Sequence, residues 1–543
     1  MKILSLLSLA ALLACAGPKQ DAKPIAETPQ APASVAPQPQ PPAQMPTTPP
    51  KEPPPTGTAT AAQATQGVTT PAAAPPLMPD EEFRQKKPDP LPVQPHFDPP
   101  VPVEKKLKNG ARVLIVENHQ IPLVTVEVAV LHGVDADPPG KPGLAEFVAD
   151  MLDEGTKTRS AAKLAEEIED LAAHLGTGAS LQTSSASLNC LTETLPQALD
   201  LLADVVRNPA FRKEDAERVR VIKLTHLEQK KASLGALAGD EANRVLFGEK
   251  HPWGQPSGGT PESVAAVTPD DLAAFHSAWW VPNDAIISVA GDVKAAEVVK
   301  LLEEKFAGWE RHPLPKLALP PLPPLAERRI DALDKPTATQ SQVWVVGRLF
   351  PARDPDAVPL RVANLTLGGL FGSRLNLNLR EKHGYSYGVR SGLSLLRDTG
   401  TFVASGGIVA KNTVEAVVEY ESELKRFAGG DVTDEELAVA KAAFIRGIPA
   451  SLETNDAVAR EMANLVSLGL PLDYYQHLPG RVEKLRKKDV ARVARKWIKP
   501  DKWAVIIVGP VGSAKDALEK LGLGPVELKP APGSGSAPSA EKK

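Results

Sequence analysis

Hydrophobic positions along the chain predict short strands followed by amphipathic helices. Residues 111–116 and 123–130 have the alternation typical of strands, and the second run places four valines on one face. Residues 144–152 and 164–175 instead carry apolar side chains at helical spacing, and a glycine just beyond the second segment ends it. Strands that alternate with such helices favour an α+β sandwich, in which helices pack on a mostly antiparallel sheet.

The chain also contains an internal repeat. Asp271, Trp279, Pro282 and Gly291 flank an apolar run, and each has a counterpart 218 residues later (489 − 271 for the first). The counterparts are Asp489, Trp497, Pro500 and Gly509. A constant spacing over a helix, a turn and a closing apolar strand predicts two copies of one domain.

Composition completes the domain plan. Proline, alanine, glutamine and threonine dominate the stretch before about residue 100, and such a stretch cannot bury enough apolar surface to fold. A shorter Pro-rich segment separates the two copies, and a tail rich in Gly, Ser, Pro and Lys follows the second. The predicted segments are a signal peptide (1–15), a disordered linker (16–100), a first domain (102–312), an interdomain linker (313–327), a second domain (328–512) and a disordered tail (528–543).

The first residues predict export. Lys2 precedes an apolar run at residues 3–13 that is too short to cross a bilayer. The run ends in Leu-Leu-Ala-Cys, which resembles a bacterial lipobox and would make Cys15 an acylated N-terminus that anchors the protein to a membrane. An ordinary signal peptide cut near Ala16 is the alternative. Because alanine rather than aspartate follows the cysteine, we expect a lipid-anchored protein of the outer membrane that faces the periplasm.

Charge and cysteine content argue against a nucleic-acid-binding protein and against a disulfide-stabilised one. The formal net charge is −4 without long charged blocks, which argues against nucleic-acid binding. The mature chain would hold no internal disulfide, because Cys190 is the one cysteine besides Cys15. Cys190 lies in an alternating run at residues 184–191, so a buried structural thiol is expected there.

Several short motifs follow one another along both copies. The motifs are Gly-Thr at 155–156, Asn-Pro-Ala-Phe at 208–211, His-Pro-Trp-Gly at 251–254, Leu-Gly-Gly at 367–369, Ser-Arg-Leu at 373–375 and Leu-Arg-Glu-Lys at 379–382. Their order over some 400 residues resembles the M16 family of zinc peptidases, which includes insulinase and the mitochondrial processing peptidase. The resemblance implies two homologous α+β sandwich domains that enclose a peptide-binding chamber.

Active members of that family carry His-x-x-Glu-His on the first helix. The two histidines bind Zn²⁺, the glutamate between them is the general base, and a later glutamate is the third ligand. In this chain Glu146 and Asp150 stand at the histidine positions, Ala149 stands at the base position, and Leu224 or Thr225 stands at the third. All four functional positions differ, so the resemblance implies no catalytic residue and no metal site in this chain.

Two interpretations of the changed helix remain open. Glu146 and Asp150 suit a hard cation better than zinc, and such a cation would require further oxygen ligands. Alternatively, both carboxylates and Asp153 form the solvent-facing side of the helix, opposite its apolar side.

The second copy retains a pair that the family uses to bind substrate. Arg380 and Tyr387 are seven residues apart, the spacing at which an arginine and a tyrosine of the family bind the peptide and polarise its carbonyl. Tyr385 and His383 are secondary candidates. The alternative is an arginine in an ion pair and a tyrosine that packs on the sheet.

Changed metal positions together with a retained Arg/Tyr pair resemble the non-catalytic subunit of two-chain members of the family. The leading hypothesis is a heterodimeric periplasmic zinc peptidase, in which a separate M16 subunit with an intact His-x-x-Glu-His brings the zinc. One alternative is a peptide-binding or scaffold lipoprotein without proteolysis. The second alternative is a peptidase with an atypical carboxylate metal site at Glu146 and Asp150.

Overall fold

The computed structural model of the protein describes residues 97–324 and 328–534. The predicted signal peptide, Cys15 and nearly all of the first linker lie outside the described residues, as does the end of the tail. Within the described part, no helix is both long and apolar enough to cross a lipid bilayer.

The first sheet is built from the strands that the sequence predicts. It has six strands in the order β1-β2-β6-β3-β5-β4, and β2 runs parallel to β6 while the other neighbours are antiparallel. The strands are β1 (Val103–Lys106), β2 (Arg112–Glu117), β3 (Leu123–Val130), β4 (His174–Ala179), β5 (Ser184–Leu191) and β6 (Ala285–Gly291). Cys190 is buried on β5, and burial raises the pKa of its thiol to about 12, which keeps it protonated and unreactive.

The second sheet repeats this arrangement. Its order is β12-β7-β11-β8-β10-β9, in which β7 and β11 are the parallel pair that corresponds to β2 and β6. The strands are β7 (Ile330–Asp334), β8 (Gln340–Leu349), β9 (Ser386–Leu395), β10 (Gly400–Val409), β11 (Ala504–Gly509) and β12 (Val526–Pro530). The predicted pair of α+β domains is thereby confirmed. The edge strands differ, because β1 precedes β2 at the start of the first half, whereas β12 follows β11 at the end of the second half.

The second half extends further than the sequence predicted. Residue 512 was expected to end the second domain and residue 528 to begin a disordered tail. Instead, residues 526–530 form β12, which pairs in parallel with β7. The expectation of a disordered tail is therefore wrong for residues 528–530, because Val526 and Leu528 pack on the second-half core.

Helices of the first half follow the predicted order. The helices are α2 (Leu144–Leu152), α3 (Ala161–Asp170), α4 (Leu195–Arg207), α5 (Lys213–Lys230), α6 (Leu234–Phe247), α7 (Pro261–Ala266), α8 (Pro269–Trp279) and α9 (Ala295–Lys305), with 3-10 turns η1 (Val134–Ala136), η2 (Thr192–Thr194), η3 (Pro252–Gly254) and η4 (Pro282–Asp284). The helix predicted over residues 164–175 is too long. It ends at Asp170 because Ala172 adopts a left-handed backbone with φ 48°, and Leu175 lies on β4 instead.

Helices of the second half complete the repeat. The helices are α10 (Ala357–Asn364), α11 (Arg374–Asn376), α12 (Thr413–Ala428), α13 (Asp434–Ser451), α14 (Asn455–Ser467), α15 (Tyr474–Glu483), α16 (Lys487–Trp497) and α17 (Lys515–Glu519), with π-helices η5 (Leu365–Gly369) and η6 (Leu377–Lys382) and 3-10 turns η7 (Ala410–Asn412) and η8 (Pro500–Lys502). α16 begins 218 residues after α8 (487 − 269), which is the spacing of the sequence repeat.

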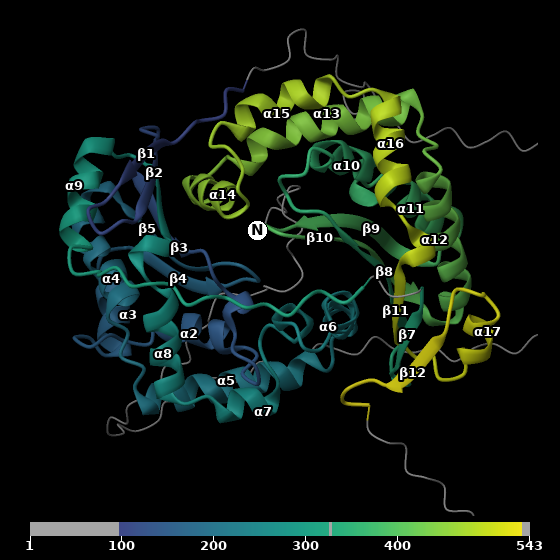
Figure 1. The fold of residues 1–543 in the computed structure, drawn as a ribbon, viewed down its shortest axis with the longest axis horizontal. Helices are drawn as coiled ribbons and strands as arrows, with labels where there is room; N and C mark the ends of the chain where they lie inside the picture. Colours follow the sequence, from purple (N-terminus) through teal and green to yellow (C-terminus); the bar gives the residue numbers. More distant parts are fainter. Residues whose placement is uncertain (1–96, 325–327, 535–543) are drawn as a thin grey trace, which may run out of the picture. The chain divides into compact units, whose positions relative to one another are not determined.

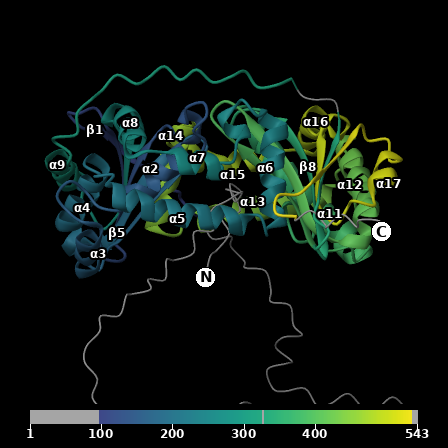
Figure 2. The same ribbon diagram turned by 90° about the horizontal axis from the view of Figure 1, so that it is seen from below.

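The two halves exchange one helix each. α6 of the first half packs on β8 and β11 of the second sheet, and α14 of the second half packs on β3 and β6 of the first sheet (Figure 1). Each contact is an apolar cluster of its own, separate from the two main cores. Because each sheet has one face covered by its own helices and part of the other covered by a helix from the opposite half, the halves depend on each other for burial. The connection between them runs without helix or strand from residue 310 to residue 324 (Figure 2).

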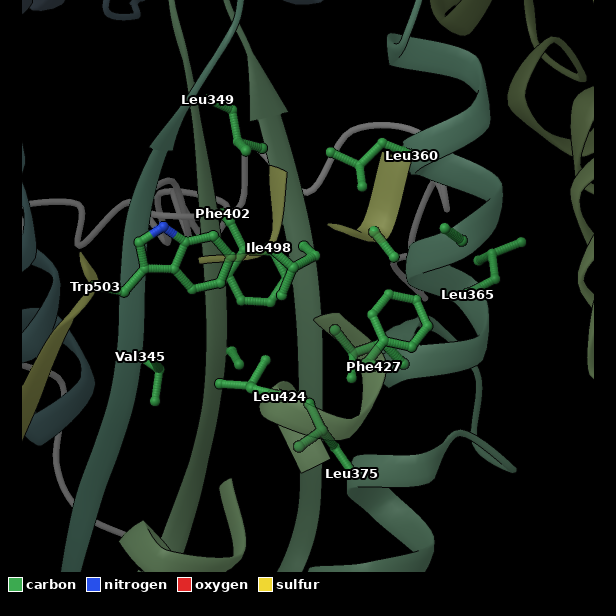
Figure 3. Packing of buried hydrophobic residues seen from close by; sticks show 14 of the residues in the cluster. Val345, Leu349, Leu360, Leu365, Leu375, Phe402, Leu424, Phe427, Ile498 and Trp503 are labelled. Atoms are coloured by element: carbon green, nitrogen blue, oxygen red, sulfur yellow. The ribbon is translucent and has the colours of Figure 1, made fainter. Parts of the chain in front are cut away.

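The main core of the second half is built around two stacked rings. Trp503 and Phe402 lie 4.5 Å apart between their ring centroids, among leucines and valines from the sheet and its helices (Figure 3). Gly347 on β8 faces this pair, and a Cβ at that position would overlap the Trp503 ring. This close packing holds the second sheet rigid, including its edge strand β9, which follows η6.

The contact between α14 and the first sheet contains a buried carboxyl group. Glu127 on β3 faces Arg460, Asp456 and Glu461 of α14, and burial raises its pKa to about 7, more than Arg460 lowers it. We expect Glu127→Gln to raise the free energy of unfolding by about 2 kcal/mol at pH 8.

The sign of this effect follows from the raised pKa. Below pH 4.5 the Glu127 carboxyl is protonated in both the folded and the unfolded state, and its contribution to the free energy of unfolding is fully present. This contribution is lost as the pH rises to about 7. Urea unfolding of both proteins at pH 4 and pH 8 measures the difference, with the exposed Glu193→Gln as the control. A difference that is the same at both pH values would contradict the burial of an ionised Glu127.

Candidate functional site

Helix α2 carries the positions at which the sequence placed the changed metal motif. The Asp137 carboxyl caps the helix by accepting the backbone N–H groups of Gly143 and Ala145, both at 2.8 Å, and burial raises its pKa to about 8. Phe147 on the apolar side of α2 belongs to the first-half core. Ala149 is buried as well, so the general-base position points into protein and holds no proton acceptor.

Asp150 is paired with a lysine from the neighbouring helix α5. The Lys223 Nζ lies 2.8 Å from the Asp150 carboxylate, and the lysine side chain is 8% exposed while the aspartate is 47% exposed. Lys223 Nζ also lies 5.6 Å from the centre of the Phe147 ring, a cation–π contact that holds it against α2. Leu224, the predicted counterpart of the third ligand, is partly buried against the first-half core. The residue of α5 that pairs with Asp150 of α2 is therefore Lys223, one position before Leu224.

These residues do not fit a zinc ion. Zinc sites use Cys, His or carboxylate ligands around the cation, whereas Asp150 already neutralises an ammonium group in the same place. That positive charge would repel a metal cation held by Glu146 and Asp150. In residues 97–324 and 328–534, no group of three His, Cys, Asp or Glu side chains is arranged to hold a metal. The carboxylate-metal alternative from the sequence therefore has no support in the geometry.

The ion pair gives a prediction about stability. We expect Asp150→Ala to lower the free energy of unfolding by about 2 kcal/mol, because it leaves the buried Lys223 ammonium without its counter-charge. Lys223→Met, which keeps the apolar stem, should change stability by less than about 1 kcal/mol. Combining the two substitutions should recover most of the loss, measured by urea unfolding. If Asp150→Ala lowers the free energy of unfolding equally in the wild type and in Lys223→Met, the ion pair contributes nothing to stability.

The second-half candidates lie on a π-helix and the strand that follows it. Arg380 is in η6, where the His383 N–H donates to the Asn378 carbonyl 3.1 Å away, a bond that spans five residues. Gly384 then turns the chain with φ +65°, and Tyr387 stands near the start of β9. The wide helical turn and the glycine bring two residues that are seven apart to the same place.

Arg380 and Tyr387 are in contact, and a third residue completes the arrangement. The Arg380 guanidinium carbon lies 5.4 Å from the centre of the Tyr387 ring and 4.6 Å from the centre of the Phe371 ring. Tyr387 is 90% exposed and Phe371 is 60% exposed, so neither ring packs into the core. We call Phe371, Arg380 and Tyr387 the aromatic–arginine patch. Phe371 was not singled out from the sequence. Its position in a glycine-rich segment was a usable signal, because glycines on both sides are unusual around a core phenylalanine.

The secondary candidates belong to a different set of contacts. The His383 and Tyr385 rings lie 4.9 Å apart, and His383 Nε2 is 3.6 Å from the Glu419 carboxylate on α12. Asn378 donates to the same carboxylate at 2.9 Å. Asn378 therefore ties η6 to α12, and His383 at the end of η6 lies beside the same carboxylate and packs on Tyr385.

Comparison with known proteins identifies both halves. Residues 112–240 match the model described as Insulinase (Peptidase family M16), and residues 266–444 match the model described as Peptidase M16 inactive domain. An uncharacterized zinc protease of Mycobacterium leprae is 28% identical over 426 residues, which cover 76% of this chain and 93% of that one. A non-peptidase homolog of Helicobacter pylori is 27% identical over 390 residues, which cover 70% and 88%. The solved peptidase M16 inactive domain of Pseudomonas fluorescens aligns with a TM-score of 0.71 and 25% identity, over 79% of this chain and 99% of that chain.

Proposed function

Because the chain belongs to the M16 family of peptidases, we propose that it is the substrate-binding, metal-free subunit of a heterodimeric zinc peptidase. In this assembly a separate M16 chain with an intact His-x-x-Glu-His supplies the zinc and the general base. The present chain supplies Arg380 and Tyr387 for the peptide. Peptides are the substrate class.

One observation carries this proposal. Arg380 and Tyr387 remain in contact at the surface of the second half, while the metal positions of the first half hold an internal ion pair. A guanidinium and a phenol both donate hydrogen bonds, so they suit a peptide carbonyl and the negative charge that develops on it during attack. A chain that acted as a peptidase alone would also require a metal and a base, and Lys223 and Ala149 occupy the corresponding places.

A second candidate is peptide capture without proteolysis. The Lys223–Asp150 pair favours it to the same degree, since that pair removes metal chemistry from this chain whether or not a partner exists. The relative from Helicobacter pylori that is called a non-peptidase homolog is consistent with either candidate.

The proposed setting is the bacterial envelope. An export signal and the lipobox-like segment that ends in Cys15 support a lipid anchor. The expected location is the periplasmic face of the outer membrane, and the Pro-rich segment would then separate the folded part from the membrane.

Affinity purification of the tagged, full-length protein from its own membranes tests the assembly. We expect a second M16 chain with His-x-x-Glu-His to copurify and the eluate to cleave peptides until a chelator is added. Zinc should restore the activity. An eluate without such a chain and without cleavage would reject the heterodimer and leave peptide capture as the function.

A further inference from the structure

We propose that Phe371 is a positioning residue for Arg380, and that the aromatic–arginine patch selects peptides that present a carboxylate. The inference deepens the proposed function and rests on it, because it names a second peptide group that Arg380 binds besides the carbonyl, for which the five N–H donors of arginine suffice. Its starting point is that Arg380 contacts two exposed rings, of which Tyr387 alone was expected from the sequence.

The two rings restrict how the guanidinium can be approached. Distances of 4.6 Å and 5.4 Å to the ring centres place Phe371 and Tyr387 within cation–π range of the Arg380 guanidinium. Both rings occupy surface of the guanidinium, so we infer that a ligand approaches the edge of the group, where its N–H donors lie in one plane.

Part of that edge is already used. The Arg380 Nε lies 3.3 Å from the Glu381 carboxylate, an ion pair at one end of the fork. Among the described residues, no acceptor within hydrogen-bond distance is recorded for the two Nη atoms, and the Arg380 side chain is 29% exposed. A planar pair of donors that lacks an acceptor among the described residues matches a carboxylate, whose two oxygens accept parallel hydrogen bonds.

One buried side chain connects the backbone segments that carry the two rings. Asn376, which is 4% exposed, donates to the Phe371 carbonyl oxygen at 2.7 Å and accepts from the Val389 backbone N–H at 3.1 Å. It thereby connects the segment that carries Phe371 to strand β9, two residues beyond Tyr387. Such bonds fix the backbones on both sides of Arg380, which makes the patch a preformed site.

Exposed apolar surface continues beside the patch. Leu377, one turn before Arg380 on η6, is 48% exposed. Exposed apolar groups around a charged centre are typical of a binding surface. The recognised peptide segment therefore has a carboxylate next to an apolar side chain.

Two labelled peptides test the inference on the full-length protein. One is an acetylated, amidated heptapeptide with a single glutamate beside a leucine, and the other has glutamine in place of the glutamate. By fluorescence anisotropy, we expect the glutamate peptide to bind about 10-fold more tightly, as one charge-assisted pair provides. Phe371→Ala should reduce this preference to less than about 3-fold, whereas Phe371→Tyr should retain it.

Controls separate positioning from a loss of structure. Val439→Ala removes a similarly exposed side chain, 54% exposed on α13, and should leave the preference unchanged. Arg380→Ala should abolish the preference. Thermal unfolding of each variant checks that the fold is intact.

Three outcomes would overturn the inference. Equal binding of both peptides by the wild type would refute carboxylate recognition, and an unchanged preference in Phe371→Ala would refute positioning. Binding of neither peptide would refute both. The proposed function is judged separately, because cleavage by the purified assembly that still depends on Arg380 would preserve it in each case.

Discussion

In the proposed heterodimeric peptidase, Arg380→Ala is expected to lower kcat/KM for peptide cleavage by about 100-fold to 1,000-fold, the range found when a donor to a developing oxyanion is removed. The Arg380 guanidinium contacts two rings, and its two Nη atoms have no acceptor within hydrogen-bond distance among the described residues. Both its charge and its direction are therefore available before the peptide arrives. Steady-state cleavage of a fluorogenic peptide by the purified heterodimer measures the effect.

The zinc content of the assembly is the first control for this prediction. It should remain unchanged in Arg380→Ala, because the proposal places the zinc in the partner chain and Arg380 in this one. Arg353→Ala is the matched substitution, since Arg353 is 58% exposed and lies outside the patch. Activity within about 3-fold of wild type in Arg380→Ala would contradict a role for Arg380 in the reaction.

Much of the architecture could be predicted because it rests on local periodicity. The valines of residues 123–130 alternate strictly, and this run became β3 with the expected bounds. The 218-residue repeat gave the second copy, since a duplicated helix, turn and strand keep their spacing. The pairing of Arg380 with Tyr387 came from the resemblance to the M16 family, and the structure adds that the two side chains are in contact.

What could not be predicted depends on contacts between distant residues. Lys223 and Asp150 are 73 residues apart, and the alignment to a metal motif drew attention to Leu224 instead. The sequence offered one signal for this contact. Arg220 and Lys223 are three residues apart and therefore share one face of α5, and in the structure both lie over Phe147. The exchange of α6 and α14 had no such signal, since an amphipathic helix does not specify which sheet it will cover.

That exchange leads to the second large effect. We expect Phe247→Ala to lower the free energy of unfolding by about 4 kcal/mol, the range for truncating a buried phenylalanine. Phe247 ends α6, is 2% exposed, and belongs to the cluster that joins α6 to Trp344 and Ile506 of the second sheet. Its ring centre lies 5.4 Å from that of Trp253 in an edge-on contact, so the truncation would also remove an aromatic pair.

The destabilisation should reach both halves, although Phe247 is a residue of the first. Loss of α6 uncovers the second sheet, and an unfolding second half withdraws α14 from the first sheet. Calorimetry should therefore record one transition that moves as a whole, while Val221→Ala, at a 63% exposed position on α5, should leave it in place. Two transitions, of which Phe247→Ala shifts only one, would mean that the halves fold independently. A single transition would explain why the chain keeps a first half whose metal positions have changed: the second half, with Arg380 and Tyr387, needs α6 to cover its sheet.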